Sequence, residues 1–185
     1  MLRKLLLFIR KHYLKVDDRS QLEIAIANGL IIGKNVTVKG ECIIDPGHCW
    51  LIEIGDNVTL APRVHVLAHD ASTKNCLGYT RIQKTKIGNN VFVGAGSIIL
   101  PGVIIGDNCI IGAGSVISRS IPEGSVAAGN PASVIGSYED FIHRRKEELR
   151  KGPVFDESYI IGIISEEKKK EMQQSLSSNK IGYII

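Results

Sequence analysis

Residues 87–121 read IGNNVFVGAGSIILPGVIIGDNCIIGAGSVISRSI, and a large aliphatic residue occupies every sixth position through residue 117. The series is Ile87, Val93, Ile99, Ile105, Ile111 and Ile117. A period of six fits neither an α-helix nor an alternating strand. It is typical of a β-solenoid, in which each short strand stacks on the strand one full turn away. The stretch therefore predicts an all-β solenoid built from hexapeptide repeats.

Two other positions of each hexapeptide support this prediction. Counted from the aliphatic residue, the fourth position is Asn or Gly and the fifth is small or β-branched. Asn and Gly tolerate positive φ, so we expect a tight turn at each fourth position. The first and fifth positions should point into the core. A β-sandwich with glycine-rich turns is the alternative, but its strands would not keep a period of six over so many units.

The same frame appears earlier in the chain, with two breaks. It starts at Ile32, is interrupted around residues 46–50, resumes at Ile54 and is lost after Val66 until Ile87. We expect the second break to be a loop ejected from the coil, at about residues 68–86. The predicted organisation is an N-terminal helical cap (1–31), the solenoid (32–136) and a C-terminal helical extension (137–185).

The bulk composition excludes several function classes. The 185 residues carry a net charge of +4, without a basic patch interleaved with aromatic residues, which argues against nucleic-acid binding. The four cysteines, Cys42, Cys49, Cys76 and Cys109, lack CxxC spacing. They predict free thiols and a reducing, cytoplasmic location rather than disulfides or a cysteine zinc site.

Helices are expected at both ends. Residues 1–15 place apolar side chains on one helical face and Arg and Lys on the other. This segment is too short to span a bilayer, so we expect it to cap the solenoid, with a weak peripheral membrane contact as the alternative. Residues 137–140 predict a capping box that opens a helix to about Lys151. A second helix is expected from Ser165 to about Leu176.

His69 is the main catalytic candidate. It lies where the coil gives way to the long loop, and a long loop in a regular solenoid is typical of a functional segment. Imidazole titrates near neutral pH, which suits general-base chemistry. The alternative for a lone histidine is a structural or surface role.

Three segments carry a resemblance to a known family. They are IEIGDNVTLAPRVHVLAHDAS (52–72), IGNNVFVGAGSIILPGVIIGDNCIIGAGSVI (87–117) and SVAAGNPASVIG (125–136). The chain resembles the hexapeptide-repeat acyltransferases, in the branch of galactoside, maltose and polysaccharide O-acetyltransferases. The resemblance implies a left-handed parallel β-helix, a homotrimer, and acetyl-CoA as the acyl donor, with donor and acceptor meeting between subunits. It implies no metal.

The resemblance also assigns roles to individual residues. His69 matches the family's catalytic base, which takes a proton from the acceptor hydroxyl as that hydroxyl attacks the thioester. Ala95 and Ala113 match contacts to the thiol end and the pantetheine arm of CoA, and the neighbouring glycines would let that arm lie close to the coil. Ser118 and Arg119 match a pair near the nucleotide end.

Some family features have no clear counterpart. Ser133 and Gly136 stand where basic residues often follow the Gly-Asn-Pro turn, so Arg144, Arg145 or Lys146 would have to replace the 3′-phosphate contact. Phe92 corresponds to a Trp near the CoA site. The acceptor-side Asn has no match, and Asp45, His48 and Trp50 in the first break are our candidates for the acceptor pocket, with packing against a neighbouring subunit as the alternative for Trp50.

These observations predict an acetyl-CoA-dependent O-acetyltransferase that acts on a sugar or polysaccharide hydroxyl. A nucleotide-sugar N-acyltransferase is the alternative, because an amine acceptor needs a similar base. A trimeric zinc carbonic anhydrase on the same coil would need converging histidines, for which His48, His65 and His69 are the candidates. A non-catalytic solenoid scaffold and a serine acetyltransferase are weaker alternatives.

Overall fold

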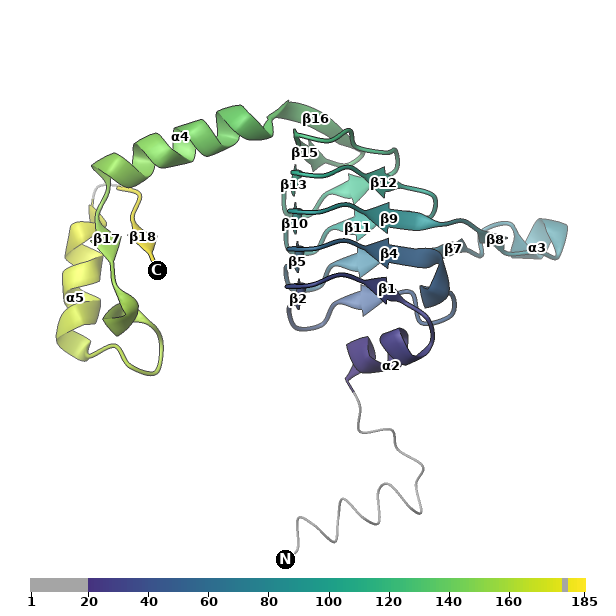
Figure 1. Ribbon diagram of the computed structural model, residues 1–185, viewed down its shortest axis with the longest axis horizontal. Coiled ribbons are helices and arrows are strands. Elements are labelled where there is room, and N and C mark those ends of the chain that lie inside the picture. Colours follow the sequence, from purple (N-terminus) through teal and green to yellow (C-terminus); the bar gives the residue numbers. More distant parts are fainter. Residues whose placement is uncertain (1–19, 178–179) are drawn as a thin grey trace, which may run out of the picture. The chain divides into compact units, whose positions relative to one another are not determined.

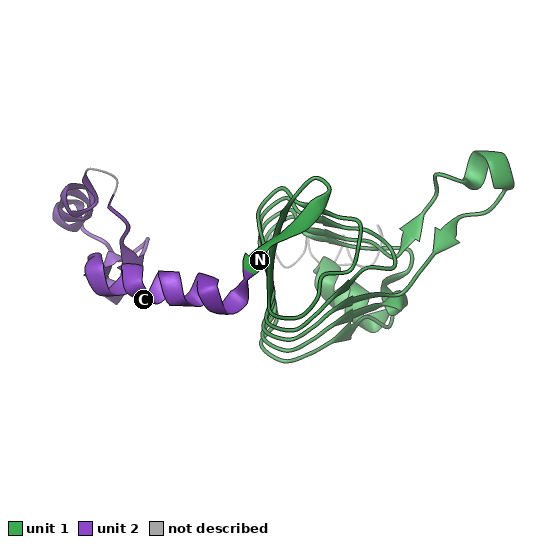
Figure 2. Ribbon diagram, turned by 90° about the horizontal axis from the view of Figure 1, so that it is seen from above, with its two compact units in different colours: residues 1–136 green, residues 137–185 purple. Residues whose placement is uncertain are grey.

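The computed structural model describes residues 20–177 and 180–185, and the amphipathic segment 1–15 lies outside the described residues. The chain divides into two compact units, residues 1–136 and 137–185 (Figure 2). Within the described residues, no helix is long and apolar enough to cross a membrane.

The first unit is a left-handed parallel β-helix, as the resemblance implied. The short strands other than β16 stack in parallel on three sheets, and each coil passes from the first sheet to the second and then to the third (Figure 1). The first sheet holds β1 (Ile31–Ile32), β4 (Ile52–Ile54), β9 (Thr85–Ile87) and β12 (Ile104–Ile105). The second holds β2 (Thr37–Val38), β5 (Thr59–Leu60), β10 (Phe92–Val93), β13 (Ile110–Ile111), β15 (Ser125–Gly129) and β16 (Ala132–Ser137). The third holds β3 (Ile43–Ile44), β6 (His65–Val66), β11 (Ile98–Ile99) and β14 (Val116–Ile117).

The core confirms the hexapeptide pattern. The six aliphatic residues at the first positions from Ile87 to Ile117 are all fully buried, and the fifth-position residues 91, 97, 103, 109 and 115 are buried beside them. Stacked strands place identical positions in register, for example Ile99 between Val66 and Ile117. Each coil therefore buries the same two positions against the coil above and the coil below, which is how a narrow solenoid fills its interior.

The predicted turns are also confirmed. The backbone is left-handed at all the expected Asn and Gly positions, 90, 96, 102, 108 and 114. Asn35, Asn57, Asn90 and Asn108 additionally form a ladder, in which each amide donates to the next at 3.1 Å. Glu41 and Arg63 adopt the same conformation at φ 62°, although their side chains do not favour it. At these two sites the coil geometry overrides local preference.

The first coil begins after a short helix. Helix α2 (Gln21–Ala27) starts at Ser20 with a reciprocal capping box to Glu23. It lies at the N-terminal end of the stack, where Ala25 and Leu30 join the core (Figure 1). This helix covers part of the open end of the coil.

The coil is interrupted at one corner, between the third sheet and the first sheet of the next coil. We call this the return corner; it comprises residues 45–51, 67–84, 100–103 and 118–120. The first interruption carries the 3₁₀ helix η1 (Cys49–Leu51). The second is the ejected segment, an antiparallel hairpin of β7 (His69–Asp70) and β8 (Arg81–Ile82) with α3 (Lys74–Leu77) between them. Along the stack the coils superpose, and this hairpin projects from one corner (Figure 2).

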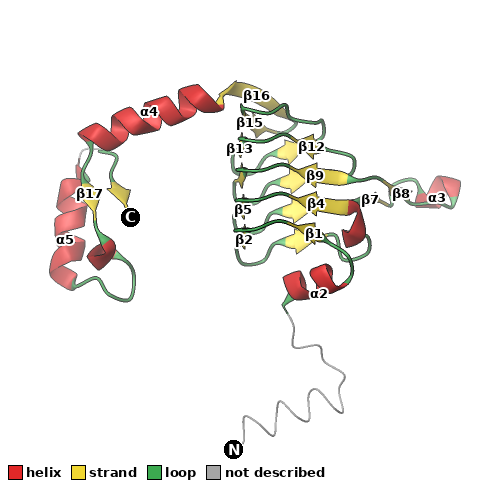
Figure 3. Cartoon of the chain, in the orientation of Figure 1, coloured by secondary structure: helices red, strands yellow, loops and turns green. Residues whose placement is uncertain are grey.

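The second unit is mainly helical (Figure 3). Helix α4 (Tyr138–Lys151) starts at Ser137, whose hydroxyl accepts from the Asp140 N–H, and ends before Gly152, as predicted. Helix α5 (Glu166–Ser175) is capped by Ser165. The sequence did not predict the two-stranded parallel sheet of β17 (Val154–Phe155) and β18 (Tyr183–Ile184) or the 3₁₀ helix η2 (Glu157–Tyr159).

Candidate active site

The candidate site lies where the two interruptions of the return corner stack on each other. Asp45 follows β3 and continues the strand ladder, with its N–H donating to Val66 O at 2.9 Å. His69 follows β6 one coil further on and is the first residue of the hairpin. The two residues are 24 positions apart in the sequence, and the stacking of consecutive coils brings them together.

Asp45 is fully buried, and its carboxylate contacts His69 from the preceding coil. Its Oδ2 accepts from the backbone N–H of Ala68 at 2.8 Å and of His69 at 3.0 Å, and it lies 2.6 Å from His69 Nδ1. Its Oδ1 accepts from the N–H groups of Gly47 and His48, both at 3.0 Å. Four backbone N–H groups and the His69 ring therefore contact this carboxylate, which fixes the His69 ring and the start of the hairpin together.

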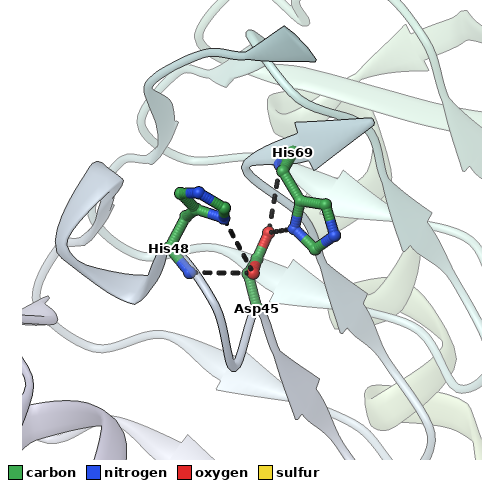
Figure 4. Close-up of side chains that lie close together, drawn as sticks. All are labelled: Asp45, His48 and His69. Carbon is green, nitrogen blue, oxygen red and sulfur yellow. Dashed lines mark hydrogen bonds and ion pairs between the residues drawn. The ribbon is translucent and has the colours of Figure 1, made fainter. Parts of the chain in front are cut away.

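The same hydrogen bonds keep Asp45 ionised. Burial alone would raise the pKa of this carboxyl, but the hydrogen bonds from Ala68, His69 and Gly47, with the attraction to the His69 ring, outweigh it and lower the pKa. A carboxylate facing Nδ1 sets the tautomer of a neutral imidazole, with the proton on Nδ1 and the lone pair on Nε2. In His69 this second nitrogen points away from Asp45 (Figure 4), and the side chain is 34% exposed. The arrangement suits a general base that receives a proton at Nε2.

The base of the hairpin is closed by a buried threonine. Thr85 Oγ1 donates to Leu67 O at 2.7 Å and accepts from the Gly102 N–H at 3.2 Å. The N–H of Gln83 donates to Ala68 O at 2.9 Å. The residues on both sides of His69 are thus tied to the coil, although the hairpin itself extends away from it.

His48 lies beside His69 in the same site. Their ring centroids are 5.0 Å apart, and His48 is 5.3 Å from the ring of Trp50. Asp45, which we expected in the acceptor pocket, has no exposed side-chain surface and instead supports both histidines. The signal for this role was its sequence position, because Asp45 directly follows a stacked strand one coil below the start of the loop.

Potential metal ligands in the site are Asp45, His48 and His69, whose ligand atoms lie within 4.8 Å of one another. An ion bound there would compete with the hydrogen bonds that already occupy both Asp45 oxygens and His69 Nδ1. His65, the third histidine considered for a zinc site, lies on β6 outside this group. The donor set therefore fits a hydrogen-bonded dyad better than a metal centre.

The residues expected to bind CoA lie at two different corners. Ser118 and Arg119 are exposed and follow β14 at the return corner, on the coil two levels beyond that of His69. Ala95 and Ala113 stack on each other, through a bond from the Gly114 N–H to Ala95 O, at the corner between the second and third sheets. Within one chain, the third sheet separates this pair from His69.

The glycines near Ala95 have a different role from the one we expected. A Cβ on Gly94 would lie 2.4 Å from Ala113 N, and one on Gly112 would lie 2.9 Å from the Ala128 Cβ. These two glycines are required by the stacking of adjacent coils, not by an open track for the pantetheine arm. Gly96 and Gly114 do face open space, but their positive φ explains them independently.

The proposed replacements for the 3′-phosphate contact, Arg144, Arg145 and Lys146, lie on α4 in the second unit. Arg145 is already engaged there, with Glu148 at 2.5 Å and over the Phe141 ring at 4.9 Å. Phe92, on β10, is 45% exposed.

Comparison with known proteins identifies the type of repeat. Residues 84–119 match the family model described as bacterial transferase hexapeptide (six repeats). These residues are hexapeptide repeats of the bacterial transferase type. The chain is 45% identical over 96 residues to protein CapG of Staphylococcus aureus, covering 50% of this chain and 56% of that protein. It is 35% identical over 126 residues to a galactoside O-acetyltransferase of Lactococcus lactis, covering 65% of this chain and 58% of that enzyme.

A solved structure supports the same branch of hexapeptide-repeat proteins. A maltose O-acetyltransferase from Clostridium difficile 630 superposes with a TM-score of 0.51 at 44% identity, covering 57% of each chain. The resemblance to galactoside and maltose O-acetyltransferases is thus confirmed. The chain spans little more than half the length of the curated relatives it matches.

Proposed function

We propose that the protein is an acetyl-CoA-dependent O-acetyltransferase that acts on a sugar or polysaccharide hydroxyl, with His69 as the general base. The observation that carries this proposal is the 2.6 Å contact between Asp45 Oδ2 and His69 Nδ1, which leaves Nε2 facing outward. The similarity of the chain to galactoside and maltose O-acetyltransferases supports the acyl transfer and the sugar acceptor.

The proposed reaction is a direct transfer. The acceptor hydroxyl gives its proton to His69 Nε2 as its oxygen attacks the thioester carbonyl carbon of acetyl-CoA. The tetrahedral intermediate collapses with cleavage of the C–S bond, and the leaving thiolate takes the proton from His69 to give free CoA. Asp45 stabilises the imidazolium between these two steps, and an ordered Asp–His pair needs no reorientation during the reaction.

We further propose that the active unit is a homotrimer. His69 and the Ala95–Ala113 pair occupy different corners of one chain, so a thioester on that pair would be remote from its own base. Copies packed side by side would bring the return corner of one subunit toward the Ala95 corner of its neighbour. In this arrangement Ser118 and Arg119 hold the nucleotide end of CoA, with Arg119 contacting phosphate. An acetyl-CoA donor and free thiols suit a cytoplasmic location.

The test is release of free CoA thiol, measured with acetyl-CoA and a panel of sugar and amino-sugar acceptors. We expect His69→Ala to lower kcat by about 10²–10⁴-fold while the protein remains folded. Transfer at the wild-type rate by this variant would refute the general-base proposal. A preference for amino sugars would instead assign an N-acyltransferase.

A further inference from the structure

Trp50 is an exposed aromatic residue on a rigid support. Its neighbour Cys49 is 1% exposed, with Sγ 3.5 Å from Ala25 O, and Ile52 is also buried in the core. Gly29 packs so tightly on this segment that a Cβ there would lie 3.1 Å from the Trp50 Cβ. The Trp50 side chain nevertheless remains 53% exposed. The fold therefore fixes the backbone of this residue and presents its indole ring to the outside.

Trp50, His48 and His69 form a row of rings. The centroid distances are 5.3 Å from Trp50 to His48 and 5.0 Å from His48 to His69, with ring planes tilted by 50° and 46°. Asp45 supports two members of this row, because its carboxylate accepts from the backbone N–H of His48 as well as from His69 (Figure 4). The row thus leads directly from the proposed base to the indole.

His48 offers its outer edge to a ligand. Its Nδ1 is buried, lies 3.9 Å from Asp45 Oδ1 and has no hydrogen-bond partner, yet the side chain is 29% exposed. The exposed surface therefore belongs to the other side-chain atoms. A buried polar atom without a partner is uncommon and is often found at functional sites. The aromatic row presents apolar ring faces and imidazole nitrogen, a combination that suits hydroxyl groups and C–H faces.

We propose that Trp50 and His48 form an acceptor subsite that binds a second ring next to the acetylated sugar. This inference rests on the proposed function. A pyranose has an apolar face of C–H groups that can lie on an indole ring and hydroxyls on its edge that can bond to imidazole. Neighbouring ring centroids of the row lie 5.3 and 5.0 Å apart, so one sugar ring can lie over His48 while the next lies on Trp50. The acceptor is therefore a disaccharide or longer glycan, with the reacting unit over His48 and its neighbour on Trp50.

The chain allows a direct binding test, because Trp50 is its single tryptophan. Intrinsic fluorescence can be titrated with maltose and lactose, and with methyl glucoside and methyl galactoside as one-ring controls. We expect a saturable change in emission whose Kd for at least one disaccharide is about tenfold below that of its one-ring control.

The outcomes separate the two proposals. A fluorescence response without any thiol release would support the subsite and refute the transferase. Transfer to these disaccharides without a fluorescence response would refute the subsite alone. Loss of the oligomer in Trp50→Ala, measured by size-exclusion chromatography with light scattering, would also refute it, because Trp50 would then be an interface residue.

Kinetics of the same variants provide a second test. We expect Trp50→Ala to raise KM for the disaccharide about tenfold at unchanged kcat. KM and kcat for the one-ring acceptor should stay the same. Trp50→Phe should keep KM for the disaccharide close to the wild-type value, because the phenyl ring also offers an aromatic face. Ile163→Ala is the matched control, since Ile163 is 70% exposed and lies in the second unit. An equal loss for both acceptors in Trp50→Ala would refute the subsite.

Discussion

The carboxylate of Asp45 lies beneath the imidazole of His69, on the preceding coil and at the same corner, with Oδ2 and Nδ1 2.6 Å apart. The N–H groups of Ala68 and His69 bind the same oxygen. One buried side chain thereby sets the orientation of the proposed base and anchors the start of the hairpin. Substitutions of Asp45 should consequently affect both catalysis and stability.

Asp45→Asn and Asp45→Ala should separate these two effects. Asparagine keeps the size of the side chain but loses the charge that stabilises the imidazolium and replaces one accepting oxygen with an NH2 donor, so we expect kcat to fall by about 10²–10⁴-fold and part of the stability to be lost. Alanine leaves four backbone N–H groups without their acceptor, and we expect an additional loss of unfolding free energy of roughly 2–5 kcal/mol. Urea unfolding and CoA release on the same preparations measure both. Equal kcat for Asp45→Asn and wild type would show that the charge is not used.

The ionisation of Asp45 predicts a pH dependence of stability. Because folding lowers its pKa, the unfolded chain binds this proton more readily, and the stabilisation is present above the unfolded pKa of about 3.9. It is lost as the pH falls through the lower folded value. We therefore expect the urea midpoint of wild type to fall more steeply than that of Asp45→Asn between about pH 5 and pH 3.

The comparison with Asp45→Asn isolates one carboxyl. The pKa values of Asp70, Asp107 and Asp156 are also lowered by hydrogen bonds, but these groups are present in both proteins. Parallel pH profiles for wild type and variant would mean that Asp45 makes no pH-dependent contribution to stability.

Stacking should make the glycines of the coil differ sharply in their tolerance of alanine. Gly94→Ala places a Cβ 2.4 Å from a backbone nitrogen, and we expect a loss of about 1–3 kcal/mol. Gly96→Ala has open space but φ +69°, and we expect about 1–2 kcal/mol. Gly40→Ala meets no atom within 4 Å at an ordinary φ and serves as the control, within about 0.5 kcal/mol of wild type. Chemical denaturation of the three variants gives the order directly.

The asparagine ladder should contribute measurable stability. Asn90 bonds to Asn57 and Asn108 and has φ 55°, so it combines two hydrogen bonds with a strained backbone. We expect Asn90→Gly to cost about 0.5–1.5 kcal/mol through the lost hydrogen bonds. Asn90→Ala should cost about 1–2 kcal/mol more, because alanine also resists the left-handed conformation. If both variants unfold at the same urea concentration, the backbone conformation does not decide the choice of Asn.

Much of the first unit could be predicted from the sequence because a solenoid repeats one environment. A period of six identifies both the buried positions and the left-handed turns. Glu41 and Arg63 could not be assigned in this way, since coil geometry rather than their own preference sets their φ. For Gly94 we expected that the absence of a side chain makes room for the pantetheine arm, and this was wrong. A Cβ at this position would point at the next coil, which the sequence does not show.

The candidate site was predictable in part. His69 stood out because it borders the longest break in the period. The link from Asp45 to His69 was missed, although each residue follows a stacked strand of the third sheet, because the unequal spacing of the coils hides which residues of successive coils stack. The β-hairpin within residues 68–86 also lacked a sequence signal, since its strands contain only two residues each.

The register of the first sheet shows how the coil accommodates added chain. Ile32 pairs with Ile54, 22 residues on, and Ile54 with Ile87, 33 residues on, whereas Ile87 pairs with Ile105 after the regular 18. The extra residues of the two longer steps leave at the return corner and re-enter in phase. Chain length at this corner is therefore free to vary without disturbing the strands. Exchange of residues 45–51 between related proteins should therefore transfer the preference for an acceptor while the stacked strands of the coil stay unchanged.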